Sequence, residues 1–208
     1  MNEDLEKLTL FLLGNCSVGK TAFINKYVNN KFEEYNATVG IDFFSKVTKL
    51  PTGEELKLLF YDTAGKEKYK AISFNLIKNA HGIILMYDIS DRETFVDIGR
   101  WLESIKEEKG ENFPLIIVGN KCDLTEVRQI TKEEGEKLAK DNGFSFMETS
   151  CKDGINIEES VQMLVLNIMQ GRKQKKLKEI ENKNEIGNKR FTLTSEKHEM
   201  EKKKKKCC

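Results

Sequence analysis

Residues 14–21 have the types and spacing of a phosphate-binding loop. They read Gly-Asn-Cys-Ser-Val-Gly-Lys-Thr, which fits the pattern G-x-x-x-x-G-K-S/T, and they lie between a strand-like run and a helical pattern. Glycines let the backbone turn its N–H groups toward phosphate oxygens, and the start of the helix adds partial positive charge. We expect Lys20 to reach the β- and γ-phosphates and the Thr21 hydroxyl to bind Mg²⁺. The alternative, an ordinary glycine turn that caps a helix, is disfavoured because the strand and helix context is met.

A second motif, Asn120-Lys121-Cys122-Asp123, bears on which base is bound. It directly follows the aliphatic run 115–118. The carboxylate of Asp123 can accept from the guanine ring N–H and the exocyclic amine together, and adenine offers neither donor there. A site built for one base leaves a buried charge unpaired with the other. Lys121 can lie along the base plane, and Asn120 can tie neighbouring loops together. The alternative to a base-binding motif is a solvated turn, which is less favoured because the motif lies downstream of a phosphate loop.

Three weaker motifs gain weight beside these two. Residues 149–152, Thr-Ser-Cys-Lys, could present backbone N–H groups to the guanine carbonyl, although a helix N-cap explains them equally well. Residues 62–65, Asp-Thr-Ala-Gly, end a predicted strand, where Asp62 suits an outer-sphere magnesium position and Gly65 can bring its N–H to the γ-phosphate. Thr38 is a candidate second hydroxyl ligand for Mg²⁺, although an isolated threonine is usually a surface or strand residue.

Apolar runs that predict strands alternate with amphipathic patterns that predict helices. The predicted strands are 8–13, 41–50, 55–61, 82–87, 115–118 and 145–148, and the predicted helices are 19–29, 94–108, 131–142 and 157–171. The alternation predicts an α/β domain with a mostly parallel sheet. Such sheets bind ligands at the carboxyl ends of their strands, and each motif falls just after a predicted strand.

Length and composition are those of one domain with a substantial core. The chain has 208 residues, of which 38% are hydrophobic. Its start does not resemble a signal peptide and no run is long enough to cross a bilayer, so we expect a cytosolic chain. The five cysteines include no C-x-x-C pair and no His/Cys cluster, which argues against zinc and against a disulfide framework.

The net charge of +1 conceals two opposed parts. Residues 172–206 contain 14 basic and 6 acidic residues, about +8, whereas the rest contains 21 basic and 28 acidic residues, about −7. Apolar periodicity fades beyond about Lys173, so residues 174–208 are predicted to be a flexible, disordered tail with its own electrostatic partner. The lysine run 202–206 could attract anionic lipid. The alternatives are a solvated tail or a nuclear or nucleic-acid patch, and the adjoining cysteines disfavour both.

Taken together, the chain resembles a Rab-family GTPase of the Ras superfamily over about residues 8–173, which would form the GTPase domain 1–173. The segments that carry the resemblance are GNCSVGKT, ATVGIDFF, YDTAGKEKY, GIILMYDIS, GNKCDL and ETSCK. It implies a P-loop NTPase fold, a six-stranded mostly parallel sheet with helices on both faces. It also implies GTP, GDP and Mg²⁺ as ligands, and two switch segments around Thr38 and Gly65 that the γ-phosphate orders.

The motifs and the resemblance together give a set of expected site residues. The nucleotide-binding residues are Gly14, Asn15, Cys16, Ser17, Val18, Gly19, Lys20, Thr21, Ala22, Phe32, Thr38, Gly65, Asn120, Lys121, Asp123, Leu124, Ser150, Cys151 and Lys152. Phe32 matches the aromatic residue that packs on guanine. The expected metal ligands are Thr21, Thr38 and Asp62, and the expected catalytic residues are Lys20, Gly65 and Lys66.

Three positions depart from the family pattern. Tyr61 stands where the family usually has Trp, and the segment from Phe32 to Thr38 is about one residue shorter than usual. Lys66 stands where the family has Gln, which orients the attacking water. A glutamine amide can accept from water and donate to phosphate, whereas lysine only donates. We therefore expect slow intrinsic hydrolysis. A partner that supplies both an arginine and a glutamine would restore fast hydrolysis.

The paired cysteines Cys207 and Cys208 resemble a double geranylgeranylation site. Two lipid chains attach a protein stably where one attaches it marginally, and the five preceding lysines add attraction to anionic lipid. The expected place is the cytoplasmic face of an intracellular or plasma membrane, with a cytosolic pool. The resemblance implies an exchange factor, an activating protein, a GDP-dissociation inhibitor or escort protein, and effectors as partners of a monomer, and no nucleic acid.

Two function classes stay open, and a third is disfavoured. The first is a regulated GTPase switch in vesicle traffic, and the second is a mainly GTP-bound membrane scaffold in which Lys66 prevents turnover. The third, a P-loop kinase, would need an acceptor site and a lid, and residues 120–123 argue against it.

Overall fold

The computed structural model describes residues 5–32, 41–63, 77–174, 176 and 177. The chain divides into two units, Met1–Ile168 and Met169–Cys208, and the fold and the site described below belong to the first. The predicted tail lies outside the described residues from residue 178 onward. Within the described ranges, no helix combines the length and the apolar character that crossing a bilayer requires.

Strands and helices alternate along the first unit, as the patterns predicted. In chain order they are β1 (Glu6–Leu13), α1 (Lys20–Asn29), β2 (Ile41–Lys49), β3 (Glu55–Thr63), β4 (Gly82–Asp88), α3 (Arg92–Val96), α4 (Ile98–Lys109), β5 (Leu115–Asn120), the 3₁₀ turn η2 (Thr125–Val127), α5 (Lys132–Asn142) and β6 (Ser145–Thr149). A last helix begins at residue 157.

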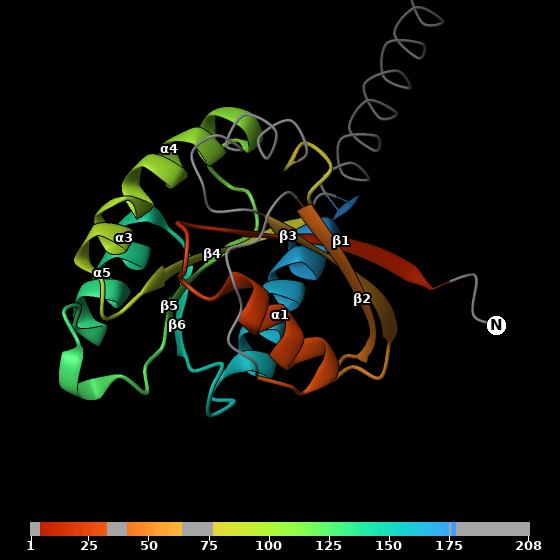
Figure 1. Cartoon of the computed structure of the whole chain (residues 1–208). Coiled ribbons are helices and arrows are strands. Elements are labelled where there is room, and N and C mark those ends of the chain that lie inside the picture. The colour runs from red at the N-terminus through yellow and green to blue at the C-terminus, as the bar shows by residue number, and fades with distance from the viewer. Residues whose placement is uncertain (1–4, 33–40, 64–76, 175, 178–208) are drawn as a thin grey trace, which may run out of the picture. The chain divides into compact units, whose positions relative to one another are not determined.

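The strands form one six-stranded sheet in the order β2-β3-β1-β4-β5-β6 (Figure 1). Every neighbouring pair is parallel except β2 and β3, which are antiparallel. The predicted six-stranded, mostly parallel sheet is therefore confirmed. Because β1, β3, β4, β5 and β6 run the same way, their carboxyl ends meet at one edge, where ligands bind in sheets of this kind.

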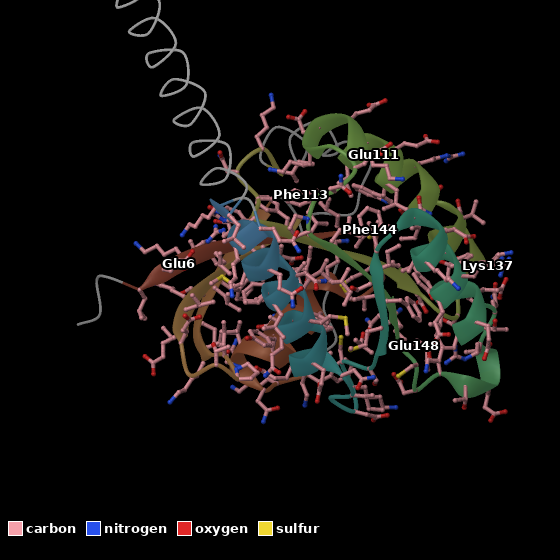
Figure 2. The ribbon with its side chains drawn as sticks, turned by 180° about the vertical axis from the view of Figure 1, so that it is seen from behind. Glu6, Glu111, Phe113, Lys137, Phe144 and Glu148 are labelled. Atoms are coloured by element: carbon pink, nitrogen blue, oxygen red, sulfur yellow. The ribbon has the colours of Figure 1, made fainter. Side chains whose placement is uncertain are left out.

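The helices cover both faces of this sheet. Helix α1 lies on one face, and α3, α4 and α5 lie on the other (Figure 1). All residues of β4 and β5 are buried, as expected of parallel strands that are covered on both sides. Phe113 and Phe144 pack against the core beneath α4 and α5 and are labelled in the view from behind (Figure 2).

The single helix predicted over residues 94–108 is wrong, because the structure has two helices there. Helix α3 begins after Asp91, whose carboxylate accepts from the Glu93 N–H, and α4 begins after Asp97. The backbone of Asp97 stays helical, with φ −69° and ψ −15°, so the apolar periodicity runs on across the break and does not reveal it.

A buried tyrosine requires two glycines in the elements around it. Tyr87 of β4 is fully buried, and its Oη has no hydrogen-bond partner among the described residues. A Cβ on Gly119 would lie 2.7 Å from this Oη, and one on Gly135 would lie 2.5 Å from it and 2.5 Å from Cζ of Phe146. The packing of α5 against the sheet therefore depends on a missing side chain at Gly135.

Candidate functional site

The loop between β1 and α1 is held in place by contacts that only glycine allows. Gly14 has φ +134°, and a Cβ there would lie 2.2 Å from the Met86 carbonyl oxygen in β4. Gly19, the N-cap of α1, has φ +98°, and a Cβ there would lie 2.3 Å from Nδ2 of Asn120 in β5. Both values of φ are in the region that favours glycine, so the loop is shaped by its two outer glycines.

Lys20 is a buried cation at the start of α1. Its side chain is 6% exposed, and Nζ donates to the carbonyl oxygens of Gly14 at 3.0 Å and Asn15 at 2.7 Å. Burial lowers the pKa of Lys20 from 10.5 to about 8, and the nearby Asp62 carboxylate opposes that shift. A buried ammonium group that is held by carbonyl oxygens at the end of a glycine loop fits a polyphosphate ligand.

Thr21 and Asp62 place two oxygen atoms beside this lysine. The Thr21 hydroxyl donates to Oδ2 of Asp62 at 2.5 Å, and Asp62 is fully buried at the end of β3. A hydroxyl and a buried carboxylate next to a phosphate loop are the kind of oxygen ligand that Mg²⁺ takes. These two expected metal ligands fit the ion, while Thr38 lies outside the described residues.

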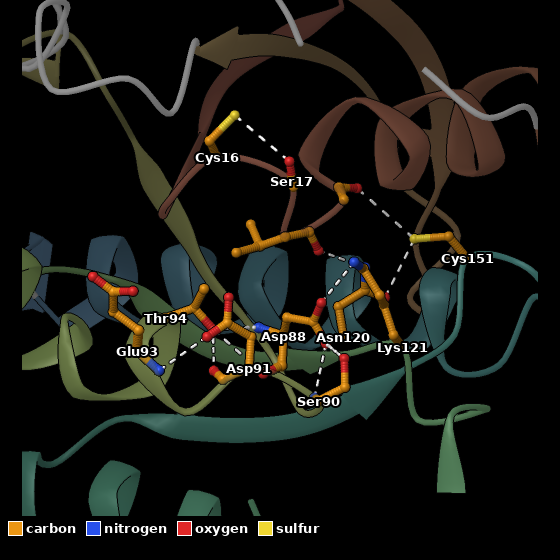
Figure 3. A network of polar contacts seen from close by, with 12 residues as sticks. Cys16, Ser17, Asp88, Ser90, Asp91, Glu93, Thr94, Asn120, Lys121 and Cys151 are labelled. Carbon is orange, nitrogen blue, oxygen red and sulfur yellow. Dashed lines mark hydrogen bonds and ion pairs between the residues drawn. The ribbon is translucent and has the colours of Figure 1, made fainter. Parts of the chain in front are cut away.

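Asn120, the last residue of β5, contacts the phosphate loop and Cys151 (Figure 3), and it also contacts β6. Its Nδ2 donates to the Val18 carbonyl oxygen at 2.8 Å, and its Oδ1 accepts from the Thr149 hydroxyl at 3.0 Å. The same Oδ1 lies 3.3 Å from Sγ of Cys151, and burial raises the pKa of this thiol to about 12. The side chain was expected to tie loops together, and these contacts do so.

Asp123 lies beside the turn that follows β6. Its Oδ1 accepts from the Ser150 hydroxyl at 2.6 Å, and Oγ of Ser150 accepts from the Asp153 N–H at 3.0 Å. The alternative that residues 149–152 form a helix N-cap is wrong, because the next helix begins only at residue 157. Orienting the Asp123 carboxylate in this way suits the acceptance of two N–H donors from a base.

Lys121 makes an ion pair that sequence reasoning missed. Its φ is +67°, and its Nζ lies 2.6 Å from Oδ2 of Asp88 at the end of β4 (Figure 3). The other oxygen of Asp88 accepts from the N–H of Ser90 at 2.8 Å and from its hydroxyl at 2.7 Å. Asp88 could have been suspected from its place at the end of a buried parallel strand, where the other motifs also fall.

The remaining expected residues divide by place. Phe32 is 41% exposed, Lys152 is exposed and Leu124 is half-buried. Gly65 and Lys66 lie outside the described residues.

The fold and the contacts at the sheet edge define the class of the protein, a nucleotide-binding domain of the P-loop type.

Comparison with known proteins narrows that class. The sequence model of the Ras family matches residues 9–170. The chain is 38% identical to the Ras-related protein Rab-13 of Mesocricetus auratus over 161 residues, 77% of this chain and 79% of that protein. It is 42% identical to the GTP-binding protein Rab-3D of Rattus norvegicus over 75% of this chain and 71% of that protein. The match to Rab-8 of Diplobatis ommata is 40% over 77% and 76%.

The chain therefore belongs to the Ras family and is a small GTPase of the Rab type. Its ligands are GTP, GDP and Mg²⁺, and proteins of this type act at membranes in vesicle traffic. The resemblance that the sequence motifs suggested is confirmed.

Proposed function

We propose that the chain is a regulated GTPase switch that recruits effectors in its GTP state and hydrolyses GTP slowly unless a partner assists. The observation that supports this most is the grouping at one sheet edge of a buried lysine, a Thr–Asp oxygen pair and an oriented aspartate (Lys20, Thr21, Asp62 and Asp123). Mg²⁺, when bound, would neutralise charge on the β- and γ-phosphates.

The residues of the chain divide the work of hydrolysis between them. Lys20 holds positive charge against the phosphate oxygens, so that it stabilises charge that develops as water attacks the γ-phosphate in line. Thr21 at the start of α1 and Asp62 near the end of β3 would hold Mg²⁺, and Asn120 keeps the phosphate loop fixed beside the base. Asp123 selects guanine through its carboxylate.

Slow hydrolysis follows from the chemistry of Lys66. Its ammonium group donates hydrogen bonds and cannot accept one from the attacking water, so it cannot orient that water as a glutamine amide does. Single-turnover GTP hydrolysis by the wild type and Lys66→Gln tests this, and we expect the variant to be faster by at least about tenfold. Equal rates would contradict the role given to Lys66. An activating protein that supplies both an arginine and a glutamine would accelerate hydrolysis by the wild type, and the arginine alone is worth about 10³ to 10⁵ in rate once the water is oriented.

A second candidate, a mainly GTP-bound scaffold, is favoured by the same lysine. Nucleotide occupancy after purification separates the two, followed by hydrolysis with and without a cell extract. Bound GDP, or GTP that the extract hydrolyses, supports the switch. Bound GTP that persists with the extract supports the scaffold.

Membrane attachment and partners complete the proposal. Cys207 and Cys208 would carry geranylgeranyl groups, and lysines 202–206 would add attraction to an anionic membrane surface. An exchange factor, an activating protein and a GDP-dissociation inhibitor or escort protein would control the cycle between the cytosol and the cytoplasmic face of a membrane. Replacing both cysteines by serine should move a tagged protein into the cytosol, and unchanged membrane localisation would contradict the lipid sites.

A further inference from the structure

The side chain of Asn15 joins the phosphate loop to helix α4. Its Nδ2 donates to Oδ2 of Asp97 at 2.7 Å, and its Oδ1 accepts from Nε1 of Trp101 at 2.9 Å. These partners lie 82 and 86 residues further along the chain. The side-chain amide of Asn15 thus donates to one residue and accepts from another, and both lie at the start of α4.

Asp97 is the N-cap residue of α4, yet its side chain does not cap that helix. An aspartate at this position ordinarily accepts from an N–H of the first turn. Here no side-chain cap hydrogen bond forms, and the carboxylate instead accepts from Asn15 and, at 3.1 Å, from Arg100. The Asp97 side chain is 17% exposed, whereas Arg100 is 77% exposed. The better-buried interaction of the carboxylate is the one with the phosphate loop.

The same residue, Asn15, supports Lys20 through its backbone. Its carbonyl oxygen accepts from Nζ of Lys20 at 2.7 Å. The loop is thus fixed at Gly14 by β4, at Val18 by Asn120, and at Asn15 by α4. Two of these attachments, at Gly14 and Asn15, are at the residues whose carbonyl oxygens accept from Lys20, and the shorter of the two hydrogen bonds is at Asn15.

We propose that Asn15, Asp97 and Trp101 form a clamp, named here the Asn15 clamp, that positions the phosphate loop and slows nucleotide release. It acts through the loop, so all three are positioning residues. The inference rests on nucleotide binding and is independent of the slow hydrolysis proposed for Lys66.

Exchanging the asparagine and the aspartate between positions 15 and 97 tests the Asn15 clamp. Asn15→Asp places two carboxylates at the 2.7 Å contact, where neither can donate unless one takes up a proton. Adding Asp97→Asn restores a donor on the helix side, and the carboxylate introduced on the loop side still accepts from Trp101. The double variant therefore has the same contacts with donor and acceptor exchanged.

GDP dissociation is measured by displacing a fluorescent GDP with excess GDP in the presence of Mg²⁺. We expect Asn15→Asp to accelerate release by at least about tenfold, as loss of a charge-assisted hydrogen bond should. We expect the double variant to release GDP within about threefold of wild type, as the coupling in such a cycle requires.

Trp101 gives a direct readout, since it is the only tryptophan of the chain. Its emission should change in Asn15→Asp and return in the double variant. Asp91→Asn is the matched control for the Asp97→Asn change, because it removes the same negative charge at the N-cap of the neighbouring α3, where the carboxylate accepts from the Glu93 N–H. We expect wild-type GDP release from this control.

The clamp would be overturned if Asn15→Asp released GDP at the wild-type rate. It would also be overturned if the double variant released GDP as fast as Asn15→Asp does. If Asn15→Asp only destabilised the fold, its unfolding temperature would fall and adding Asp97→Asn would not restore slow GDP release. That result would also overturn the clamp. Failure of the wild type to bind GDP at all would overturn nucleotide binding itself, and is recognised before any variant is made.

Discussion

The charge of Lys20 depends strongly on its surroundings. Burial lowers its pKa to about 8, and the nearby carboxylate of Asp62 compensates for this only in part. Phosphate oxygens would favour the charged form and raise the pKa again. The binding of nucleotide and the binding of a proton are therefore linked at this one nitrogen atom.

This linkage predicts proton uptake when GDP binds. At pH 8 about half of the Lys20 side chains in the nucleotide-stripped protein are neutral, so binding should take up about half a proton, and more as pH rises to 9. Titration calorimetry in buffers of different ionisation heat measures this number. We expect GDP affinity to fall across the same range.

The lowered pKa of Lys20 also affects folding. The unfolded chain binds more protons than the folded chain between about pH 8 and 10.5, so the Lys20 contribution makes the stripped protein more stable as pH rises through that window. Proton uptake that stays constant from pH 7 to 9 would contradict a lowered pKa at Lys20.

At the scale of elements, the contact between α5 and the sheet depends on a glycine in a helix. Alanine is the better helix former by up to about 1 kcal/mol. A Cβ on Gly135, however, would lie 2.5 Å from Oη of the buried Tyr87 and 2.5 Å from Cζ of the partly buried Phe146. Overpacking a core typically costs about 1–3 kcal/mol, so the steric effect should exceed the propensity gain.

Gly135→Ala should therefore lower the free energy of unfolding by about 1–2 kcal/mol, as measured by chemical denaturation. Gly99→Ala is the matched control, since Gly99 lies in α4 with no atom within 4 Å of its added Cβ. We expect that control to be neutral or more stable by up to about 1 kcal/mol. If both variants shift stability in the same direction, the tight contact at Gly135 is not limiting.

Elements with short-range patterns were predictable, and contacts between distant segments were not. The aliphatic runs of β4 and β5 predicted buried parallel strands, and the strand-end rule predicted that Lys20, Asp62 and Asn120 would gather at one edge. The break at Asp97 was missed, because the backbone there remains helical and the side chain hydrogen-bonds to a residue 82 positions earlier, which local periodicity does not reveal. The Asp88–Lys121 pair was missed for a similar reason, since a single sequence does not reveal which charges meet.

At the scale of the whole molecule, charge is distributed unevenly along the chain. Residues 172–206 hold an excess of positive charge of about +8, and the remainder holds about −7. Near a membrane with anionic lipids, the basic part is attracted and the acidic part is repelled, within roughly a Debye length of about 8 Å at physiological salt. Net charge alone hides this, because the two parts nearly cancel.

Changing lysines 202–206 to glutamine should therefore weaken the binding of the lipidated protein to anionic vesicles. Each lysine near the surface contributes at most about 1 kcal/mol, and salt screening reduces that, so we expect a loss of about 10- to 1,000-fold in partition at low salt. The loss should shrink as salt rises, and neutral vesicles should bind wild type and variant equally. Lys132→Gln, Lys137→Gln and Lys140→Gln on exposed positions of α5 form the control, which removes charge from the acidic part of the chain. Equal losses per lysine removed in the two sets would mean that net charge, and not its position in the chain, determines attraction to the membrane.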